Sequence, residues 1–285
     1  MKKTIANKIF AGFAAAALLA VGSSCGGNAP AATTTTTAAP ANNTAATDDS
    51  LQKVLDAKKL VLGLDASFPP MGFTDEANNI VGFDIDVAEE VCNRMGITLV
   101  KQPIVWENKE EDLNIGKIDC IWNGMSINAA RAEAMNLSEA YMKNEMIFVV
   151  PGDSTVKTMD DLKGKTIGVQ NGSSAQEILE ASDLFKDIKV TPLEDNVTLL
   201  SQMELGFSDA VFLDSVVAYY FIQENHKDYV VLPGNLESEE YAIGFRKADQ
   251  ALRDKVQETL SAMKADGKLG EISTKWFGSD VTTVK

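Results

Sequence analysis

Short apolar runs alternate with amphipathic segments along most of the chain. Short apolar runs are typical of buried strands, and apolar residues that recur every three or four positions are typical of helices. This pattern predicts strands at 60–64, 97–105, 118–122, 146–150, 166–170, 210–213 and 229–232. It predicts helices at 84–92, 175–182, 197–205, 215–224, 251–263 and 269–276. Strands that alternate with helices predict an α/β fold with parallel-rich sheets and helices on both faces.

Two segments of the predicted strand–helix pattern resemble each other. GKIDCI at 116–121 and GFSDAV at 206–211 each follow a helical segment and open an apolar strand. The first strand is expected to end at Asn123-Gly124 and the second at Leu213-Asp214. Ligands of open α/β sheets bind beyond the carboxyl ends of the strands. Two such units predict two similar lobes that share a cleft, although a match of this length also arises by chance.

The N-terminus has the pattern of a targeting segment. Lys2, Lys3 and Lys8 precede an uncharged, mostly apolar stretch at 9–21. This stretch is short for a membrane span, which takes about 20 residues. Small residues at 22–24 lead into Cys25 and suit a signal peptidase. We therefore predict a signal peptide at 1–24, and we expect an exported protein.

Cys25 is the candidate lipid anchor. A small-residue run that ends in a single Cys resembles a bacterial lipobox, although Gly22 stands where that motif usually has Leu. The resemblance implies acylation of Cys25 and attachment to the lipid bilayer of the cell envelope, on its periplasmic or extracellular face. The alternative is ordinary secretory cleavage with Cys25 as a bystander. Residues 28–47 contain only Ala, Thr, Asn and Pro, so 25–50 is expected to be a disordered tether with a reach on the order of 25 Å.

Charge and composition exclude several classes of function. The chain has 26 Lys and Arg against 41 Asp and Glu, which argues against nucleic-acid binding and against adsorption to anionic lipid heads. His226 is the only histidine, so a zinc site built on several imidazoles is excluded. We expect no cofactor and no metal. Cys92 and Cys120 are expected to be small buried residues, and a disulfide between them is the alternative that export permits.

Six segments between residues 59 and 278 carry a family resemblance. They are GLDASFPP at 63–70, VGFDID at 81–86, NGMSI at 123–127 followed by Arg131, DLKGKTIGVQ at 161–170, DG at 266–267 and KWFG at 275–278. Their order and spacing resemble the solute-binding proteins of polar amino-acid ABC transporters, bacterial family 3. The resemblance implies a monomeric receptor that closes on a free amino acid and delivers it to an ABC permease.

The same resemblance implies the two-lobed type II periplasmic-binding-protein fold, with two crossing hinge strands. The first lobe is predicted at 51–140 and 242–280 and the second at 145–237. The hinge is predicted at 141–144 and 238–241. A ligand that contacts both lobes would stabilise their closed arrangement, because only that arrangement completes the site.

A free amino acid is a zwitterion, so its receptor needs a cation for the carboxylate. The planar guanidinium of Arg131 can hold two oxygens, with charge-assisted bonds worth ~1.5–3 kcal/mol each. The resemblance implies that Arg131 binds the α-carboxylate with Ser126 beside it. Free N–H groups where 172–174 opens a helix attract anions. By resemblance, Ser173 and Ser174 complete this cradle from the second lobe, and a plain N-cap is the alternative.

The receptor also needs an anion for the α-ammonium. Asp214 follows a predicted strand and precedes a helix, and the resemblance implies that it binds the ammonium with help from the Gly124 carbonyl. An ordinary N-cap aspartate is the alternative.

The remaining predicted site residues surround the ligand's side chain. The resemblance implies that Phe68 and Trp106 sandwich that side chain, although either ring is also consistent with a core position. By the same resemblance Asp65 contacts the side chain or the ammonium, and Gln170 occupies a position that varies with specificity. Asn123 lies on the same edge.

The charges of these residues predict a class of ligand. The carboxylate offsets Arg131 and the ammonium offsets Asp214, which leaves Asp65 without a fixed partner. An acidic ligand would add a like charge in a poorly solvated cleft, so we expect a polar, non-acidic amino acid. Glutamine, cystine, histidine and the basic amino acids all meet this requirement.

A second class of function uses the same fold. Periplasmic dehydratases of prephenate-like acids and sensor domains of larger receptors share it, and a fold alone does not fix a function. His226 lies near a predicted helix end and is a poor candidate for an acid. We therefore expect a binding protein with no catalytic residues.

Overall fold

The computed structural model describes residues 48–182, 186–234 and 237–285. The strands are β1 (Lys59–Leu64), β2 (Ser67–Phe68), β3 (Gly72–Thr74), β4 (Ile80–Val81), β5 (Thr98–Pro103), β6 (Cys120–Ser126), β7 (Asn136–Leu137), β8 (Met142–Pro151), β9 (Thr166–Gln170), β10 (Lys189–Leu193), β11 (Ala210–Asp214), β12 (Tyr229–Val231) and β13 (Glu237–Phe245). The helices are α1 (Ser50–Ala57), α2 (Phe83–Met95), α3 (Lys109–Asn114), α4 (Ala129–Ala134), α5 (Ser174–Ala181), α6 (Asn196–Glu204), α7 (Ser215–Gln223), α8 (Gln250–Ala265) and α9 (Lys268–Phe277), with short 3₁₀ turns η1 (Trp106–Asn108) and η2 (Met159–Leu162). The predicted signal peptide and Cys25 lie outside the described residues.

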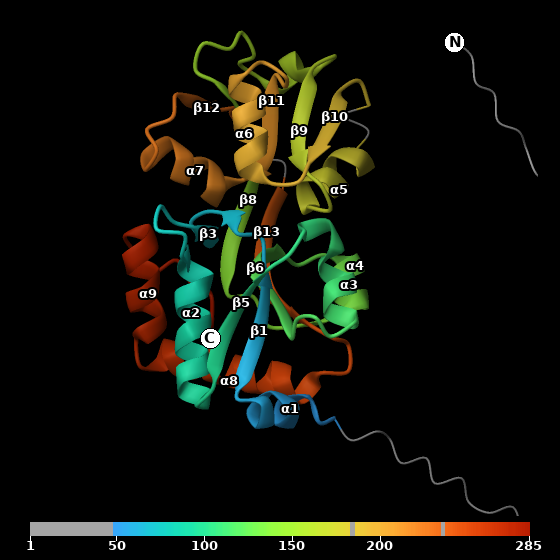
Figure 1. The fold of residues 1–285 in the computed structure, drawn as a ribbon. Helices are drawn as coiled ribbons and strands as arrows, with labels where there is room; N and C mark the ends of the chain where they lie inside the picture. The colour runs from blue at the N-terminus through green and yellow to red at the C-terminus, as the bar shows by residue number, and fades with distance from the viewer. Residues whose placement is uncertain (1–47, 183–185, 235–236) are drawn as a thin grey trace, which may run out of the picture. The chain divides into compact units, whose positions relative to one another are not determined.

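One curled sheet connects two groups of parallel strands. Its order is β10-β9-β11-β8-β13-β6-β1-β5, and β12 and β7 pair with β8 and β13. β1, β5 and β6 are parallel, as are β9, β10 and β11, whereas β8 and β13 are antiparallel to each other. We call β1–β7 with α1–α4, α8 and α9 the first half, and β9–β12 with α5–α7 the second half. Figure 1 shows the second half above the first, with β8 and β13 running between them.

The strand β6 is longer than the sequence predicts, because it pairs with the long strand β13. β8 and β13 pair over Met142–Met146 and Glu237–Tyr241. β13 then pairs with β6 at Met125 and Ser126, so β6 continues two residues beyond the end predicted at Asn123-Gly124. Every residue of β6 is buried, as expected for a strand covered on both faces. The partner strand lies far away in sequence, which local periodicity does not register.

The start of the described body corrects the predicted tether. The sequence predicts a disordered tether up to residue 50, but Ser50 is buried and begins α1. The Asp48 carboxylate accepts hydrogen bonds from the backbone N–H groups of Ser50 and Ala251. Ala251 lies in the first turn of α8, where N–H groups have no partner within the helix. A short acidic side chain satisfies one of them, and this contact ties residue 48 to α8.

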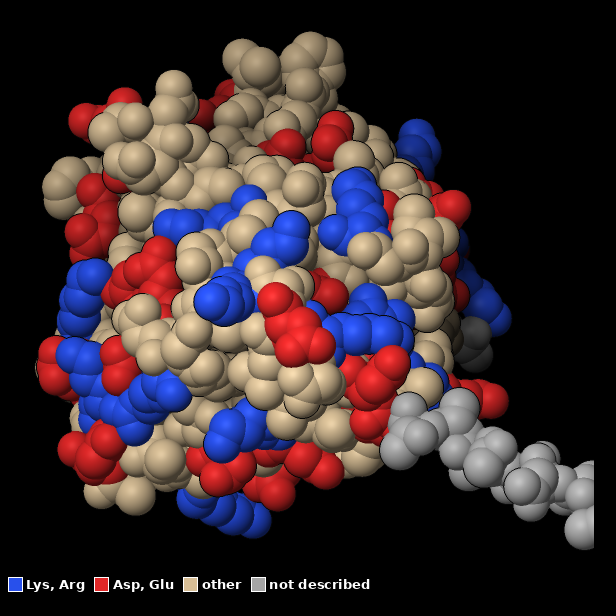
Figure 2. Space-filling model, turned by 60° about the horizontal axis from the view of Figure 1, so that its bottom comes forward, with Lys and Arg blue, Asp and Glu red and all other residues tan. Residues whose placement is uncertain are grey.

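Cys92 and Cys120 are buried, and neither forms a disulfide within the part of the chain that the structure describes. Burial raises the pKa of the Cys92 thiol to about 12. None of the helices between residues 48 and 285 that the structure describes is long and apolar enough to cross a membrane. Figure 2 shows basic and acidic side chains interspersed on one face, without a large field of either sign.

Candidate ligand-binding site

The eleven residues predicted to bind the ligand line a single cavity. They are Asp65, Phe68, Trp106, Asn123, Gly124, Ser126, Arg131, Gln170, Ser173, Ser174 and Asp214. The first seven belong to the first half and the other four to the second. Side chains from the two halves touch, and the cavity volume is about 10 Å³, room for about one water molecule. The strand ends predicted to face one another therefore do so.

Arg131 is held in place but incompletely paired. It is 2% exposed, and Asn128 caps its helix α4 by accepting from the Arg131 backbone N–H. Nη1 donates to the Ser126 carbonyl at 2.9 Å, while Nη2 lies 3.6 Å from a carboxylate oxygen of Glu177. The buried Nε–H has no hydrogen-bond partner among the described residues. A buried guanidinium with a spare donor is suited to bind a carboxylate.

Asp214 belongs to the second half and lines the same cavity as Arg131. It occupies the N-cap position of α7, yet its side chain makes no cap hydrogen bond. Its carboxylate instead accepts from Asn144 Nδ2 and from the Tyr241 hydroxyl, each at 2.7 Å. Burial, followed by the nearby Glu239 carboxylate, raises the pKa of Asp214 to about 7. The plain N-cap alternative therefore does not describe Asp214.

The two serines of the second half differ in their roles. Ser173 is an N-cap, because its Oγ accepts from the Gln176 backbone N–H at 3.2 Å, and it donates to the Gln170 carbonyl at 2.6 Å. The Oγ of Ser174 lies 3.2 Å from the Oγ of Ser126. Ser174 and Ser126 belong to different halves, so this contact joins the halves beside Arg131, which donates to the Ser126 carbonyl.

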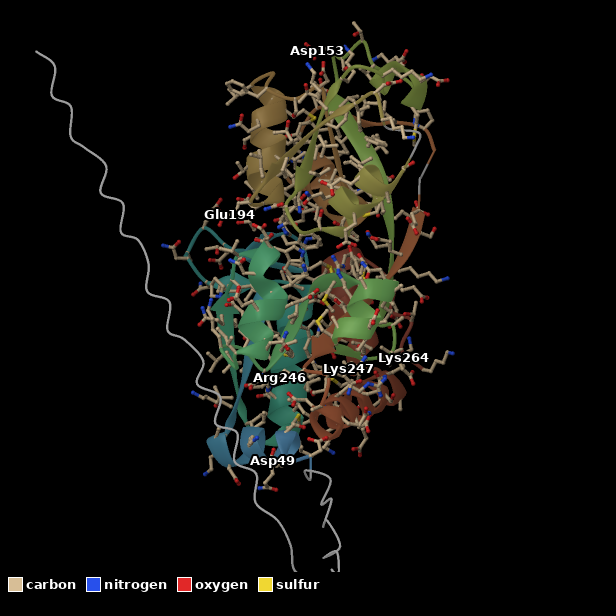
Figure 3. The ribbon with its side chains drawn as sticks, turned by 90° about the vertical axis from the view of Figure 1, so that its right-hand side faces the viewer. Asp49, Asp153, Glu194, Arg246, Lys247 and Lys264 are labelled. Atoms are coloured by element: carbon tan, nitrogen blue, oxygen red, sulfur yellow. The ribbon has the colours of Figure 1, made fainter. Side chains whose placement is uncertain are left out.

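Asp65 is hydrogen-bonded, but its partners among the described residues are uncharged. Gln170 Nε2 donates to one Asp65 oxygen at 2.7 Å, and the Ser67 backbone N–H donates to the other at 2.8 Å. Gln170 Nε2 also donates to the Glu194 carbonyl at 3.1 Å. Figure 3 shows Glu194 at the level where the two halves meet. Asp153 and Asp49 lie at opposite ends of the described body in the same view. Burial raises the pKa of Asp65 to about 6. A neutral amide leaves its charge uncompensated.

The walls of the cavity are aromatic and tightly packed. Phe68 and Trp106 are 5% and 6% exposed. Gly124 has φ 57°, and a Cβ atom there would lie 2.8 Å from a ring carbon of Phe68. The Asn123 side-chain carbonyl accepts from the Asp65 backbone N–H at 3.1 Å, while its amide nitrogen has no partner among the described residues. Glycine at 124 thus lets the Phe68 ring approach β6.

Two buried charged residues near the cavity escaped the sequence analysis. Glu239 on β13 accepts from Ser126 Oγ at 2.8 Å. Lys109 on α3 donates to the Gly172 carbonyl at 2.9 Å. Residues 239 and 241 are buried while 238 and 240 are exposed, an alternation typical of a strand with one buried face. That spacing could have identified Glu239, whereas no local signal distinguishes Lys109 from a solvated lysine.

A second, larger cavity adjoins the first. Its volume is about 700 Å³, and it shares Ser174 with the eleven-residue cavity. Its acidic lining residues are Glu145, Glu177, Glu237, Glu239 and Glu240, and Lys143 is its basic one. The clusters of carboxylates, imidazoles and thiols that metals require are absent from the residues that the structure describes. The smaller cavity combines strand ends, aromatic walls and buried charges of both signs, and it is the candidate site.

The fold and this cavity define the class of protein. Two α/β halves joined by two long strands, with a polar cavity between them, form the type II periplasmic-binding-protein fold. The chain belongs to the bacterial extracellular solute-binding proteins, family 3, whose sequence model matches residues 60–279.

Three relatives illustrate the similarity. The L-cystine-binding protein TcyJ of Escherichia coli K12 is 27% identical over 81% of this chain and 87% of its own length. The structure of Tv2483 bound to L-arginine has a TM-score of 0.80 and 30% identity, and covers 83% of this chain and 98% of that one. A substrate-binding protein of a Streptococcus pneumoniae ABC uptake transporter, with bound histidine, has a TM-score of 0.78 and 37% identity, and covers 83% and 99%.

Proposed function

We propose that the protein is a lipid-anchored receptor that captures a polar, non-acidic amino acid outside the cell membrane and delivers it to an ABC permease. One observation carries this proposal. Arg131 from the first half and Asp214 from the second are both buried on the same cavity. A buried cation and a buried anion on opposite walls are complementary to the carboxylate and ammonium of a zwitterion.

The charges around the cavity support a non-acidic ligand. Among the described residues, the buried cations there are Arg131 and Lys109, and the buried carboxylates are Asp65, Asp84, Asp214 and Glu239, of which Asp84 accepts from the Gly124 backbone N–H. The carboxylates outnumber the cations by two, and a zwitterion leaves this balance unchanged. A ligand with a cationic side chain would offset part of the excess, and an amide would donate to Asp65 in place of Gln170. The names of the relatives above give cystine, arginine and histidine as their ligands, and none of these side chains has a net negative charge.

The division into halves supports a closing motion. We infer that the predicted lobes, 51–140 with 242–280 and 145–237, rotate about 141–144 and 238–241. Residues 142–144 and 238–241 lie in β8 and β13, the two long strands that pass between the halves, and Tyr141 directly precedes β8. The side-chain contacts Asp65–Gln170 and Ser126–Ser174 both cross from one half to the other. A ligand that replaces them would stabilise the closed state through contacts to both halves.

Export and anchoring complete the proposal. The leader at 1–24 directs the chain across the membrane, Cys25 attaches it to lipid, and the segment that follows acts as a tether. The protein would work as a monomer at the periplasmic or extracellular face of the envelope.

A dehydratase of prephenate-like acids is the second candidate. The pKa values of Asp65 and Asp214, about 6 and about 7, lie in the range that suits a general acid. His226 is exposed and does not line the cavity. Incubation with a prephenate-like acid separates the two functions, because an enzyme yields product over many turnovers and a receptor yields none.

Titration of the intrinsic tryptophan fluorescence tests the proposed ligand class. Trp106 lines the cavity, so its emission should report occupancy. Arginine, histidine, glutamine and cystine are compared with glutamate and aspartate. We expect saturable changes with at least one member of the first group at lower concentration than with either acid. Tighter binding of glutamate or aspartate than of every amide or basic amino acid would contradict the charge argument.

A further inference from the structure

Lys109 is a buried lysine with no carboxylate partner among the described residues. It is the first residue of α3 and is 4% exposed. Its ammonium donates to the Gly172 carbonyl at 2.9 Å and lies 5.2 Å from the centre of the Trp106 ring. A carbonyl and an aromatic face each stabilise a cation, but neither supplies a compensating charge. Burial of an ammonium without an anion is costly, so a counter-charge is expected nearby.

Lys109 and Arg131 converge on the same carbonyl oxygen. Arg131 Nη2 lies 3.5 Å from the Gly172 oxygen that Lys109 also contacts. Both cations belong to the first half, and Gly172 belongs to the turn between β9 and α5 in the second half. The Trp106 ring under the ammonium lines the candidate site. Two buried cations therefore meet at the carboxylate end of the cavity, one at its wall and one directly behind it.

The other charged groups around Lys109 do not neutralise it. Glu107 on η1, Glu110 on α3, Glu177 on α5 and Arg131 on α4 are the ones that act on its charge. Glu177 is half exposed and already lies beside Arg131 and Asn128. Burial and then Arg131 outweigh the three glutamates and lower the pKa of Lys109 to about 8. An anion bound at Arg131 would favour the charged form of Lys109.

We propose that Lys109 is a positioning residue that holds the Gly172 turn against the first half and supplies a second positive charge to the ligand's carboxylate. The inference rests on the proposed function, because it assumes that the carboxylate of an amino acid binds at Arg131. It assigns a role to a residue that lies outside the eleven lining the cavity. It also predicts that affinity depends on the protonation of Lys109.

The sign of this dependence follows from linkage. Lys109 is charged below its pKa, so its contribution to affinity is fully present near neutral pH. Binding of an anion raises the pKa further, and the contribution is lost as the pH rises through the pKa of the bound form. The ligand's own α-ammonium also titrates at alkaline pH. Its effect is common to all variants and cancels in the ratio of two dissociation constants at the same pH.

The test compares variants of the purified full chain by calorimetry. The probe is the amino acid, among the twenty plus cystine and ornithine, that raises the wild-type melting temperature most. Lys109→Met should weaken binding on the order of tenfold at about pH 7. The ratio of its dissociation constant to that of the wild type should approach one towards about pH 10. Lys109→Arg keeps a permanent charge and should retain more affinity than Lys109→Met, without losing it at high pH.

A matched control and three outcomes decide the inference. Lys117→Met removes an exposed lysine that follows the same helix and pairs with Asp112, and its affinity should equal that of the wild type. Equal affinity of Lys109→Met and wild type, or a ratio that stays constant with pH, would overturn the role of Lys109 alone. If Lys109→Met does not fold, the wild type is compared with Lys109→Arg instead. A ratio of their dissociation constants that stays constant up to about pH 10 would also overturn the role of Lys109. If no amino acid binds the wild type, the proposed function itself fails.

Discussion

Arg131 is the side chain on which ligand binding should depend most. Its guanidinium is buried, its Nε–H has no partner among the residues that the structure describes, and a carboxylate oxygen of the half-exposed Glu177 lies 3.6 Å from Nη2. Arg131→Ala should lower the affinity at least about 100-fold, because a buried carboxylate would lose its charged partner. Calorimetry with the best-binding amino acid measures the loss. Arg94→Ala removes a surface arginine paired with Glu90 and Asp266 and is the control. A folded Arg131→Ala protein with near-normal affinity would remove Arg131 from the site.

The carboxyl groups of the cavity predict a dependence on acid pH. Asp214 and Asp65 have pKa values of about 7 and about 6, both raised chiefly by burial. Only the ionised forms attract an ammonium group, so affinity is expected in full above about pH 7. It should fall as the pH is lowered through the two pKa values. Asp214→Asn should bind more weakly and lack the upper of the two steps. Wild-type affinity that stays constant from about pH 8 to about pH 5.5 would refute this account.

The residues that the sequence revealed and those it did not differ in a physical way. Most of the eleven lining residues lie near strand ends or helix starts, in or beside the segments that carry the family resemblance, and that resemblance identified them. Lys109 begins a helix whose next three residues are acidic, and it has the sequence context of a solvated lysine. It is buried because Gly172 and Trp106 pack over it, and Gly172 is 63 residues away. Contacts made between the halves are not visible in local periodicity.

At the scale of elements, β6 places the site through one glycine. Gly124 has φ 57°, and a side chain there would meet the Phe68 ring at 2.8 Å. Gly124→Ala should lower the free energy of unfolding by about 2–4 kcal/mol, because it adds a steric clash to backbone strain. Gly116→Ala is the matched control, since Gly116 has φ 77° and a Cβ there would lie more than 4 Å from every described residue except its chain neighbours. Its cost should be about 1 kcal/mol. Equal losses in chemical denaturation would show that the contact with Phe68 does not matter.

The elements that periodicity predicted are the long and apolar ones. β1, β9 and β11 and helices α6–α9 lie within one or two residues of their predicted ranges. The short strands β2, β3 and β4 were not predicted, because a two- or three-residue strand has no measurable period. β10 was also missed, since its sequence Lys189–Leu193 is half polar and lies at the edge of the sheet. Its parallel pairing with β9 makes this segment a strand, although its composition does not predict one.

At the scale of the whole molecule, Cys25 is expected to determine where the protein resides. The prediction rests on the leader and on the small residues that precede a lone cysteine. Cys25→Ser should abolish lipid attachment and shift the protein from the detergent-rich to the aqueous phase after cell fractionation. Cys92→Ser is the control, because Cys92 is buried within the folded body. Membrane association that survives in Cys25→Ser would instead support ordinary secretory cleavage.

Binding of a free amino acid is the central claim, and a thermal-shift screen of the purified full chain tests it most directly. The screen covers the twenty amino acids, cystine and ornithine, each at the same concentration. A ligand that binds only the folded state stabilises it and so raises the melting temperature. At a ligand concentration one hundred times the dissociation constant, the free energy of unfolding rises by about 2.7 kcal/mol. We predict a clear rise with one or a few polar, non-acidic amino acids and none with glutamate or aspartate. No rise with any of them, or the largest rise with an acidic amino acid, would contradict the account.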